Sequence, residues 1–475
     1  MAARLTQTQR IAVGAACALI LLFEAVHFDG PSRGYWDTYI TVPAMFMTGQ
    51  PVDLHRMDGT PRFTYRLKGR VPDDTYDPTP GSYGIASEDQ RIGTAILFAA
   101  PFALVNLAAF RWGFATCWAL TFLFAFLALR RLVGGFAAPL AAALILVLNP
   151  FSLYLERLNG NALGLGVMVF LWFLLGEELA AARGEHQRGD ARPLSRSMAS
   201  WAVIGLTYGI LGGIRNEAIV LGPLFLACLW RGSPDARGGS ARLAWFAARF
   251  GTFTAAAFAG ILPVLLWNQF AYGQMLIHPS QVSHLQGFRP TFPHSFLGAE
   301  FQFNGLLNWP FHDHVVRTPH FAFPTFLLWP LVTVKSLGLA LSAAAAVGAF
   351  VLVRRRPFEA AVLLAWYGVV YLLFMFQENL EELKQTFMGL HLFPLAAFVA
   401  AGLAWLAEAP RAWRRWATIA AVACALAAGV VATRAVDAPA DERWYVRFPH
   451  ADRNESGLAD LPESLRKDWH YFYTR

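Results

Sequence analysis

Charged residues are scarce in this sequence, and their scarcity excludes an ordinary soluble domain. Asp, Glu, Lys and Arg make up 15% of the 475 residues, whereas 56% are hydrophobic and the mean hydropathy is +0.40. Soluble domains carry about 25% charged residues. Long apolar blocks alternate here with short arginine-rich breaks. The pattern predicts an all-α fold, that of a polytopic membrane protein.

Cysteine is scarce too, which argues against a disulfide framework. The four cysteines lie inside apolar blocks, where packing is their expected role: Cys17, Cys117, Cys228 and Cys424. The histidines of segment 312–320 resemble metal ligands, but their spacing in a loop matches no zinc pattern, and a solvated loop is the better interpretation. The net charge of +7 comes with no basic face or RNA-binding motif. We therefore expect no cofactor, no metal and no nucleic-acid partner.

The arginine clusters predict how the chain is oriented in the membrane. Arg4 and Arg10 precede the first apolar block, 11–28, so the positive-inside rule places the N-terminus in the cytoplasm. The later clusters are expected on the same side: Arg130–Arg131, 183–196, 231–242, 354–356 and 411–415. We expect a multi-pass protein of the cell inner (plasma) membrane.

Placing the apolar blocks under this constraint predicts about 11 transmembrane helices. Four blocks lie between the first outer loop and Arg183, where an odd number of crossings is needed. Block 93–110 is expected not to cross, because it contains Pro101 and Asn106 and because Arg111 can then stay outside. The expected spans are 11–28, 114–131, 136–153, 162–182, 199–214, 217–230, 244–267, 324–352, 358–376, 386–408 and 416–433.

Two long polar segments interrupt the apolar pattern on the outer side. The first, 29–92, includes an amphipathic stretch expected to lie along the membrane interface, and the second is 271–323. We assign residues 1–434 to one transmembrane domain, the expected catalytic unit, which includes both loops. Residues 435–475 form an outer C-terminal tail that is too short for an ordinary independent domain.

Asp37 is the first candidate for chemistry. It follows the first apolar block closely, beside Trp36 and Tyr39, aromatic residues of the kind that settle at the lipid–water boundary. A carboxylate there could act as a general base that takes a proton from an acceptor hydroxyl. The alternative is an N-cap for the helix that follows, a role that Asp fills well.

Three further charged residues close the first outer loop. Glu88 and Asp89 are either acids in the first turn of a helix or members of the active site, and the first interpretation is favoured for Glu88. Arg91 lies just outside the membrane, where a fork-shaped cation suits a lipid phosphate.

Arg215 and Glu217 lie in a charged corner between two short apolar segments. An arginine facing lipid at mid-bilayer costs about 3 kcal/mol even on insertion scales, so the corner is expected to face protein or water. One interpretation is a buried ion pair with Glu217 or another neighbour. The other is that Arg215 faces an outer cavity and helps to hold phosphate.

Two further residues mark the outer mouth of span 386–408. Lys384 is either an interface anchor or a phosphate ligand, and the second is favoured. His391 lies about two turns further along the chain and could donate a hydrogen bond to phosphate or pack as a core histidine. Packing is the favoured interpretation for His391.

These residues carry a resemblance to a known family. The chain resembles the GT-C superfamily of integral-membrane glycosyltransferases, especially the lipid-donor branch with protein O-mannosyltransferases and aminoarabinose lipid A transferases. The resemblance rests on motifs in matching order: Trp36-Asp37-Thr38-Tyr39, Thr48-Gly49-Gln50-Pro51, Arg111 ahead of a span, Asn149-Pro150 to Glu156-Arg157, Gly213-Ile214-Arg215-Asn216-Glu217, Trp267-Asn268 to Tyr272-Gly273, and Lys384 through Phe387 to Pro394.

The resemblance implies an inverting transfer of a sugar from a polyprenyl-phosphate donor to an acceptor hydroxyl on the outer face of the membrane. Asp37 would activate the acceptor, which could be a glycan, a lipid or a protein. The cations Arg91, Arg215 and Lys384 would stabilise the departing phosphate. The family's acidic pair is Asp37-Thr38 here, so a second acid would have to be Glu88 or Asp89.

Two other functions remain open on the sequence alone. A transporter or flippase of a lipid-linked glycan predicts repeated halves and charges near mid-membrane, whereas this sequence concentrates polarity at the outer face. A non-catalytic envelope-assembly subunit would make Asp37 only a helix cap.

The orientation can be tested by labelling single cysteines introduced into a variant without native cysteines. Cysteines near Asp58 and near Gln377 should react with an impermeant thiol reagent added to intact cells, because both positions are expected outside. A cysteine near Arg355 should react only after the cells are permeabilised. Labelling of the Arg355 site in intact cells would show that the predicted orientation is wrong.

Overall fold

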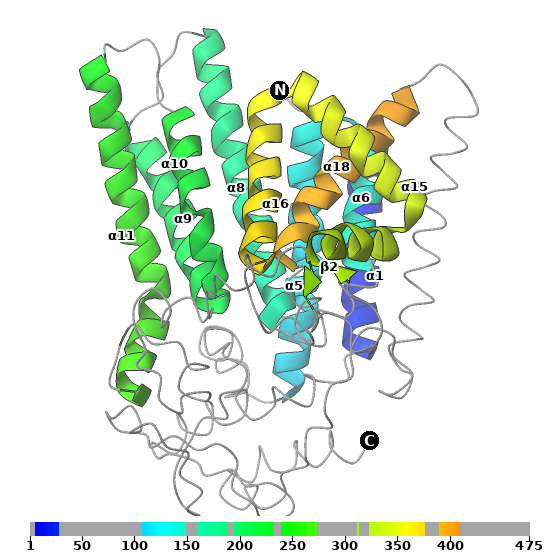
Figure 1. Cartoon of the computed structure of the whole chain (residues 1–475), viewed down its shortest axis with the longest axis horizontal. Helices are drawn as coiled ribbons and strands as arrows, with labels where there is room; N and C mark the ends of the chain where they lie inside the picture. Colours follow the sequence, from blue (N-terminus) through cyan, green and yellow to red (C-terminus); the bar gives the residue numbers. More distant parts are fainter. Residues whose placement is uncertain are drawn as a thin grey trace, which may run out of the picture.

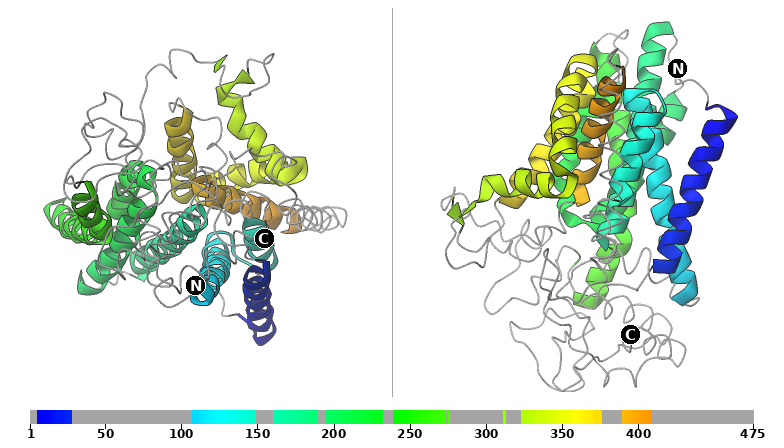
Figure 2. Two further views of the ribbon diagram at one scale, coloured as in Figure 1. Left: turned by 90° about the horizontal axis from the view of Figure 1, so that it is seen from below. Right: turned by 90° about the vertical axis from the view of Figure 1, so that its right-hand side faces the viewer.

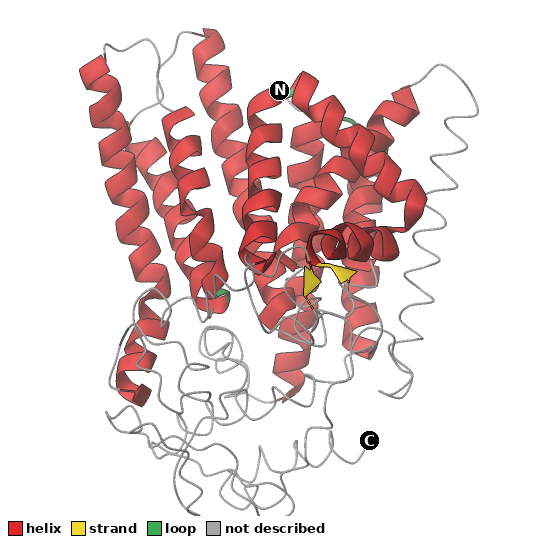
Figure 3. Cartoon of the chain, viewed as in Figure 1, coloured by secondary structure: helices red, strands yellow, loops and turns green. Residues whose placement is uncertain are grey.

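The structure is a computed structural model, and it describes residues 5–27, 107–148, 160–188, 194–231, 239–272 with 275, 311–312, 323–375 and 389–408. Its elements are α1 (Gln7–His27), α5 (Leu107–Val133), α6 (Ala137–Leu148), α8 (Gly160–Arg188), α9 (Leu194–Ile214), the 3₁₀ helix η2 (Asn216–Leu221), α10 (Gly222–Arg231), α11 (Gly239–Tyr272), β1 (Phe311–His312), β2 (Phe323–Pro324), α15 (Thr325–Arg355), α16 (Pro357–Met375) and α18 (Gly389–Glu408). Strands β1 and β2 form one short antiparallel pair, in which Phe311 lies opposite Pro324. The remaining described elements are helices, so the all-α prediction is confirmed (Figure 3).

The described helices have the length and composition of membrane spans. Seven are long and apolar enough to cross a bilayer, and three shorter apolar helices, Ala137–Leu148, Ala218–Arg231 and Pro357–Val370, accompany them. The protein is therefore a polytopic membrane protein. Each expected span before residue 409 overlaps one of these helices, whereas the expected span 416–433 lies outside the described residues.

The helix that contains the expected span 114–131 begins before it. Helix α5 begins at Leu107 and continues through Arg111 without a break, so residues 107–110 of the block expected not to cross belong to this helix. Continuing the helix satisfies every backbone hydrogen bond within one segment, which hydrocarbon requires. Residues 93–106 lie outside the described part, and the non-crossing block stays a prediction for them.

Helix α15 also departs from the expected span 324–352. Gly338 has φ 76° and ψ 163°, a conformation open to glycine alone, and it divides the helix there. The segment before Gly338 runs at a large angle to the part that follows it (Figure 1), and the part from Leu337 to Arg355 qualifies as a candidate span. The glycine thus divides one long apolar run into two helical pieces that run in different directions.

The arginine-bearing helix ends share one end of the bundle. At the end of α15, Arg355 forms a salt bridge of 3.0 Å with Glu408 at the end of α18. At the end of α5, Arg131 pairs with Glu177 of α8. The N-terminus lies at this same end (Figures 1 and 2). This arrangement agrees with the side expected for the arginine clusters, and the compartment that this end faces stays a prediction.

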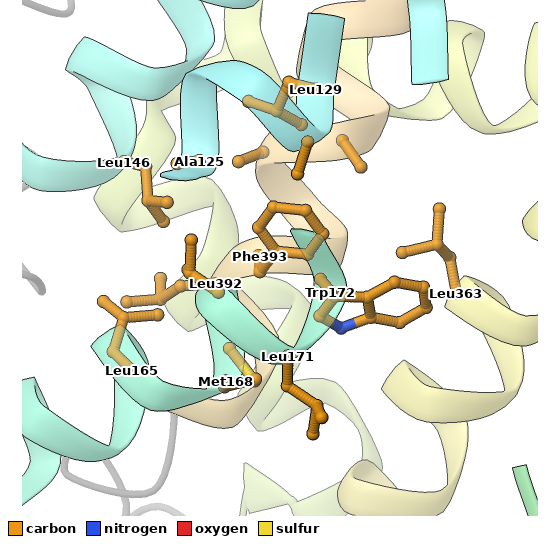
Figure 4. Packing of buried hydrophobic residues seen from close by; sticks show 14 of the residues in the cluster. Ala125, Leu129, Leu146, Leu165, Met168, Leu171, Trp172, Leu363, Leu392 and Phe393 are labelled. Atoms are coloured by element: carbon orange, nitrogen blue, oxygen red, sulfur yellow. The ribbon is translucent and has the colours of Figure 1, made fainter. Parts of the chain in front are cut away.

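An aromatic core joins the helices on both sides of α8. The Trp172 ring of α8 lies 5.1 Å from Trp366 of α16 and 5.6 Å from Phe393 of α18, centroid to centroid. Trp366 in turn lies edge-on to Phe225 of α10 at 6.0 Å. Figure 4 shows Trp172 and Phe393 together with leucines of α8 and α18. Because lipid tails are as apolar as these side chains, tight packing rather than expulsion of water holds such helices together.

Glycines allow two helix pairs to approach backbone to backbone. A Cβ atom at Gly209 of α9 would overlap the carbonyl oxygen of Ala257 in α11, and one at Gly260 would overlap that of Leu206. A Cβ at Gly348 of α15 would likewise overlap the carbonyl oxygen of Phe398 in α18. Small residues at such crossings are the usual basis of close helix contact in membranes. They fix α9 beside α11, and α9 carries the charged corner at its end.

Candidate functional site

The charged corner is a short break between α9 and η2. Arg215 has extended backbone angles, φ −138° and ψ 92°. Its N–H donates to the carbonyl of Leu211 at 2.7 Å, and its carbonyl accepts from the N–H of Ala218 at 2.9 Å. The last bond of α9 and the first bond of η2 therefore meet at one residue. Because α9 begins at the arginine-rich end, its last residue lies at the opposite end of the bundle (Figure 1).

The Arg215 side chain is buried against α8. The residue is 3% exposed, and a Cβ at Gly164 would lie 2.8 Å from its Cγ and 3.5 Å from its Cδ. The missing side chain of Gly164 thus provides the space in which the arginine stem lies. A guanidinium held inside apolar surroundings is costly, and such residues usually mark functional positions in membrane proteins.

Tyr208 packs beside the charged corner and connects the helices that meet there. Its hydroxyl donates to the carbonyl of Ile219 in η2 at 2.8 Å, which links α9 to the 3₁₀ turn. Its ring lies 4.6 Å from that of Phe225 and is stacked 5.6 Å from that of Phe253 in α11. Rings from α9, α10 and α11 therefore fix the angle at which the chain turns after Arg215.

His391 lies in the first turn of α18 and is fully buried. Its Nε2 lies 3.1 Å from the carbonyl oxygen of Tyr367, so Nε2 carries the proton and donates it. The imidazole also meets the Tyr367 ring edge-on at 4.7 Å. These are contacts of a packed histidine, the favoured interpretation, and they orient the ring against α16.

Arg215 and the aromatic core contact α8 at different depths. The stem of Arg215 lies at Gly164, whereas Phe393 of α18 stacks on Trp172. Eight residues of helix separate Gly164 from Trp172, a rise of about 12 Å. The Arg215 stem makes the contact closer to the start of α8.

The other predicted site residues lie outside the described residues: Asp37, Glu88, Asp89, Arg91 and Lys384. Nothing described bears on the Glu217 side chain either, so the ion pair of Arg215 with Glu217 stays a hypothesis. Among the described residues, no group of three His, Cys, Asp or Glu side chains is arranged as a metal site.

The sequence reasoning missed a buried carboxylate in the first helix. Glu24 of α1 is fully buried, on the same stripe of the helix as the buried Val13 and Ile20. The lipid-facing side of α1 carries Leu22 and Val26 instead. A single acid inside an otherwise apolar span was the available signal, because intramembrane acids are functional candidates by default. The contact of Gly164 with the Arg215 stem could not be predicted from the sequence, since it depends on how two helices pack.

The guanidinium of Arg215 has the chemistry that suits an anion. A guanidinium presents several N–H donors in a plane, which match the oxygens of phosphate, and a low-dielectric setting strengthens that attraction. The described part thus supplies a cation at the end of the bundle opposite the arginine clusters.

Comparisons with solved structures identify the fold. The archaeal oligosaccharyltransferase AglB from Archaeoglobus fulgidus, in complex with an inhibitory peptide and a dolichol-phosphate, matches 98% of this chain and 60% of its own, with a TM-score of 0.54 and 14% identity. ArnT from Cupriavidus metallidurans, bound to undecaprenyl phosphate, matches 92% of this chain and 66% of its own, with a TM-score of 0.52 and 15% identity. The chain has the GT-C fold.

The GT-C fold accounts for nearly the whole chain, and the resemblance expected from the sequence motifs is confirmed at the level of the fold. The chain spans 60% and 66% of the length of these two structures. No protein-family model and no curated protein sequence matches the chain.

The contact of the Arg215 stem with Gly164 can be tested by a double-mutant cycle. Gly164→Ala should destabilise the protein, because its new Cβ meets the Arg215 stem, and overpacking costs about 1–3 kcal/mol. In an Arg215→Ala background the same change should be neutral or slightly stabilising, since the stem is gone and alanine favours helix by about 1 kcal/mol. Melting temperatures in detergent measure both effects.

Gly166→Ala is the matched control for this cycle. A Cβ there would lie 2.7 Å from Thr121 Oγ1, a clash that does not involve Arg215. Its cost should be the same with and without Arg215→Ala. If Gly164→Ala lowers the melting temperature equally in both backgrounds, the Arg215 stem does not lie against Gly164.

Proposed function

We propose that this protein is a membrane glycosyltransferase that moves a sugar from a polyprenyl-phosphate donor to an acceptor hydroxyl, with inversion, on the outer face of the membrane. The fold carries this proposal. It is shared over most of the chain with AglB in complex with a dolichol-phosphate and with ArnT bound to undecaprenyl phosphate. Both ligands are long-chain lipid phosphates, the class to which the proposed donor belongs.

In the proposed mechanism Asp37 acts as the general base. It takes the proton of the acceptor hydroxyl as that oxygen attacks the anomeric carbon of the donor sugar. The bond between the anomeric carbon and the phosphate oxygen breaks, and the lipid phosphate leaves with the electron pair. Attack from the face opposite the phosphate inverts the anomeric carbon through an oxocarbenium-like state. Glu88 or Asp89 would help to position the acceptor.

The phosphate leaving group is stabilised by cations. Arg215 supports this role, because it is a cation buried at the end of the bundle opposite the arginine clusters. Arg91 and Lys384 are proposed to share the phosphate, and His391 in the first turn of α18 is proposed to contribute to the same site. A phosphate departs as an anion without being protonated, so one carboxylate base suffices for the reaction.

The donor site predicts a loss of lipid-phosphate binding in two variants. Arg215→Ala and Lys384→Ala should each weaken the binding of undecaprenyl phosphate about tenfold or more, since hydrogen bonds to charged groups contribute about 1.5–3 kcal/mol. Binding is measured by lipid titration of the purified protein. Arg354→Ala, at the arginine-rich end, is the control and should bind normally.

Two outcomes would count against this donor site. If both variants fold and bind undecaprenyl phosphate as the wild type does, the phosphate is held elsewhere. If Arg215→Ala fails to accumulate, the buried ion-pair interpretation is favoured, because an unpaired partner acid would cost about 3–5 kcal/mol.

The role of Asp37 as the general base is tested by the variant Asp37→Asn. Asparagine keeps the size and the capping ability of aspartate but loses its basicity. A positioned general base contributes about 10²–10⁴ in rate. The variant should therefore express and melt like the wild type and yet lose nearly all sugar transfer, measured by mass spectrometry of cell-envelope glycans from strains carrying each variant.

Asp37→Ala distinguishes the role of Asp37 as a general base from its role as a helix N-cap. It should lose transfer and also about 0.5–2 kcal/mol of stability if Asp37 caps a helix as well. Near-normal glycans from Asp37→Asn would remove Asp37 as the base and move the proposal to Glu88 or Asp89. Unchanged glycans after neutralising those two acids as well would favour the transporter function.

A further inference from the structure

The backbone of Arg215 is the hinge between α9 and η2. Its extended angles separate the two helical segments, and its own backbone bonds reach only to Leu211 before it and to Ala218 after it. Cγ of Arg215 and Cγ2 of Ile214 lie 2.8 Å and 3.6 Å from the position that a Cβ of Gly164 would take. The arginine stem therefore depends on the hinge angle for its place beside α8, because a change of that angle moves the stem out of this space.

A side-chain hydrogen bond spans the hinge. The hydroxyl of Tyr208 donates to the carbonyl of Ile219 at 2.8 Å, and the two residues are 11 apart in the chain, with Arg215 between them. Tyr208 lies about two turns before the hinge, on the same side of α9 as Arg215. The bond joins α9 to η2 and limits how far η2 can swing about the hinge.

The ring of Tyr208 is held in place without the help of its hydroxyl. It lies 4.6 Å from the ring of Phe225 in α10 and 5.6 Å from that of Phe253 in α11, and those two rings stack at 5.7 Å. The carbonyl of Ile219 also accepts the backbone N–H of Gly222. Loss of the hydroxyl therefore leaves the ring packed and the carbonyl hydrogen-bonded. What the hydroxyl adds is the link across the hinge.

We propose that Tyr208 is a positioning residue, whose hydroxyl fixes the angle of the charged corner and thereby holds the guanidinium of Arg215 where it meets the donor phosphate. This role rests on the proposed function, in which Arg215 stabilises the lipid phosphate. A site that is correctly formed for only a fraction of the time binds its ligand more weakly by that fraction. Side-chain hydrogen bonds between membrane helices shift an equilibrium about threefold on average and about twentyfold at most.

Tyr208→Phe tests the role, measured by titrating the purified full chain with undecaprenyl phosphate. The variant should bind about threefold to twentyfold more weakly than the wild type and yet melt within a few degrees of it. Thr207→Val is the matched control, because the Thr207 hydroxyl donates to the carbonyl of Val203 at 2.8 Å within α9 and does not cross the hinge. It should bind normally. Normal binding by Tyr208→Phe, or equal weakening by Thr207→Val, would overturn the proposal.

Gly222→Ala tests the geometry of the link without the donor. A Cβ at Gly222 would lie 3.3 Å from the Tyr208 hydroxyl, so the alanine should press on that oxygen and lose part of what it gains in helix propensity. In a Tyr208→Phe background the oxygen is absent, and Gly222→Ala should raise the melting temperature more than it does in the wild type. An equal change in both backgrounds would show that the hydroxyl does not lie in the link.

Combining Tyr208→Phe with Arg215→Ala separates the positioning role from the proposed function. Once the guanidinium is gone, Tyr208→Phe should cause no further loss of undecaprenyl phosphate binding, and losses that add in full would show that Tyr208 does not act through Arg215. If Arg215→Ala weakens binding and Tyr208→Phe does not, the positioning role alone is wrong. If Arg215→Ala folds and binds normally, the proposed donor site is wrong and the positioning role with it. Should Arg215→Ala fail to accumulate, the comparison of Tyr208→Phe with Thr207→Val decides.

Discussion

The need to satisfy every backbone hydrogen bond inside hydrocarbon governs this structure. In the described part it is met by helices, and even Arg111 is carried within a continuous helix rather than at a break. The break at Arg215 obeys the same rule, since its N–H and its carbonyl both bond to neighbouring turns. A polar corner inside the bundle is possible only because the backbone on both sides of it remains paired.

Because apolar side chains gain little by leaving lipid, the bundle depends on fit between its helices. The crossing of α9 and α11 at Gly209 and Gly260 brings their backbones into contact. The rings of Tyr208, Phe225 and Phe253 then fill the space beside that crossing. This packing fixes the corner, and the absence of a side chain at Gly164 leaves the space in which the Arg215 stem lies.

The two ends of the bundle use arginine in different ways. At the arginine-rich end, guanidinium groups lie over aromatic rings near the surface or pair with acids such as Glu408 and Glu177. At the opposite end, Arg215 is buried between helices. Exposed cations attract charge from the membrane surface, whereas a buried one is suited to a charge that forms inside the protein. The proposal of sugar transfer rests on this difference.

The sequence by itself determined the fold class, the order of the spans and the sharing of one end by the arginine clusters, because hydrophobic length and charge are local properties of the chain. It also located Arg215 at the break between two apolar helices. Only the tertiary structure decided that α15 divides at Gly338, that His391 bonds to Tyr367, that Gly164 seats Arg215 and that Glu24 is buried. The contacts of His391, Gly164 and Glu24 depend on which neighbouring helix faces the residue, and a helix face has no partner until the bundle has packed.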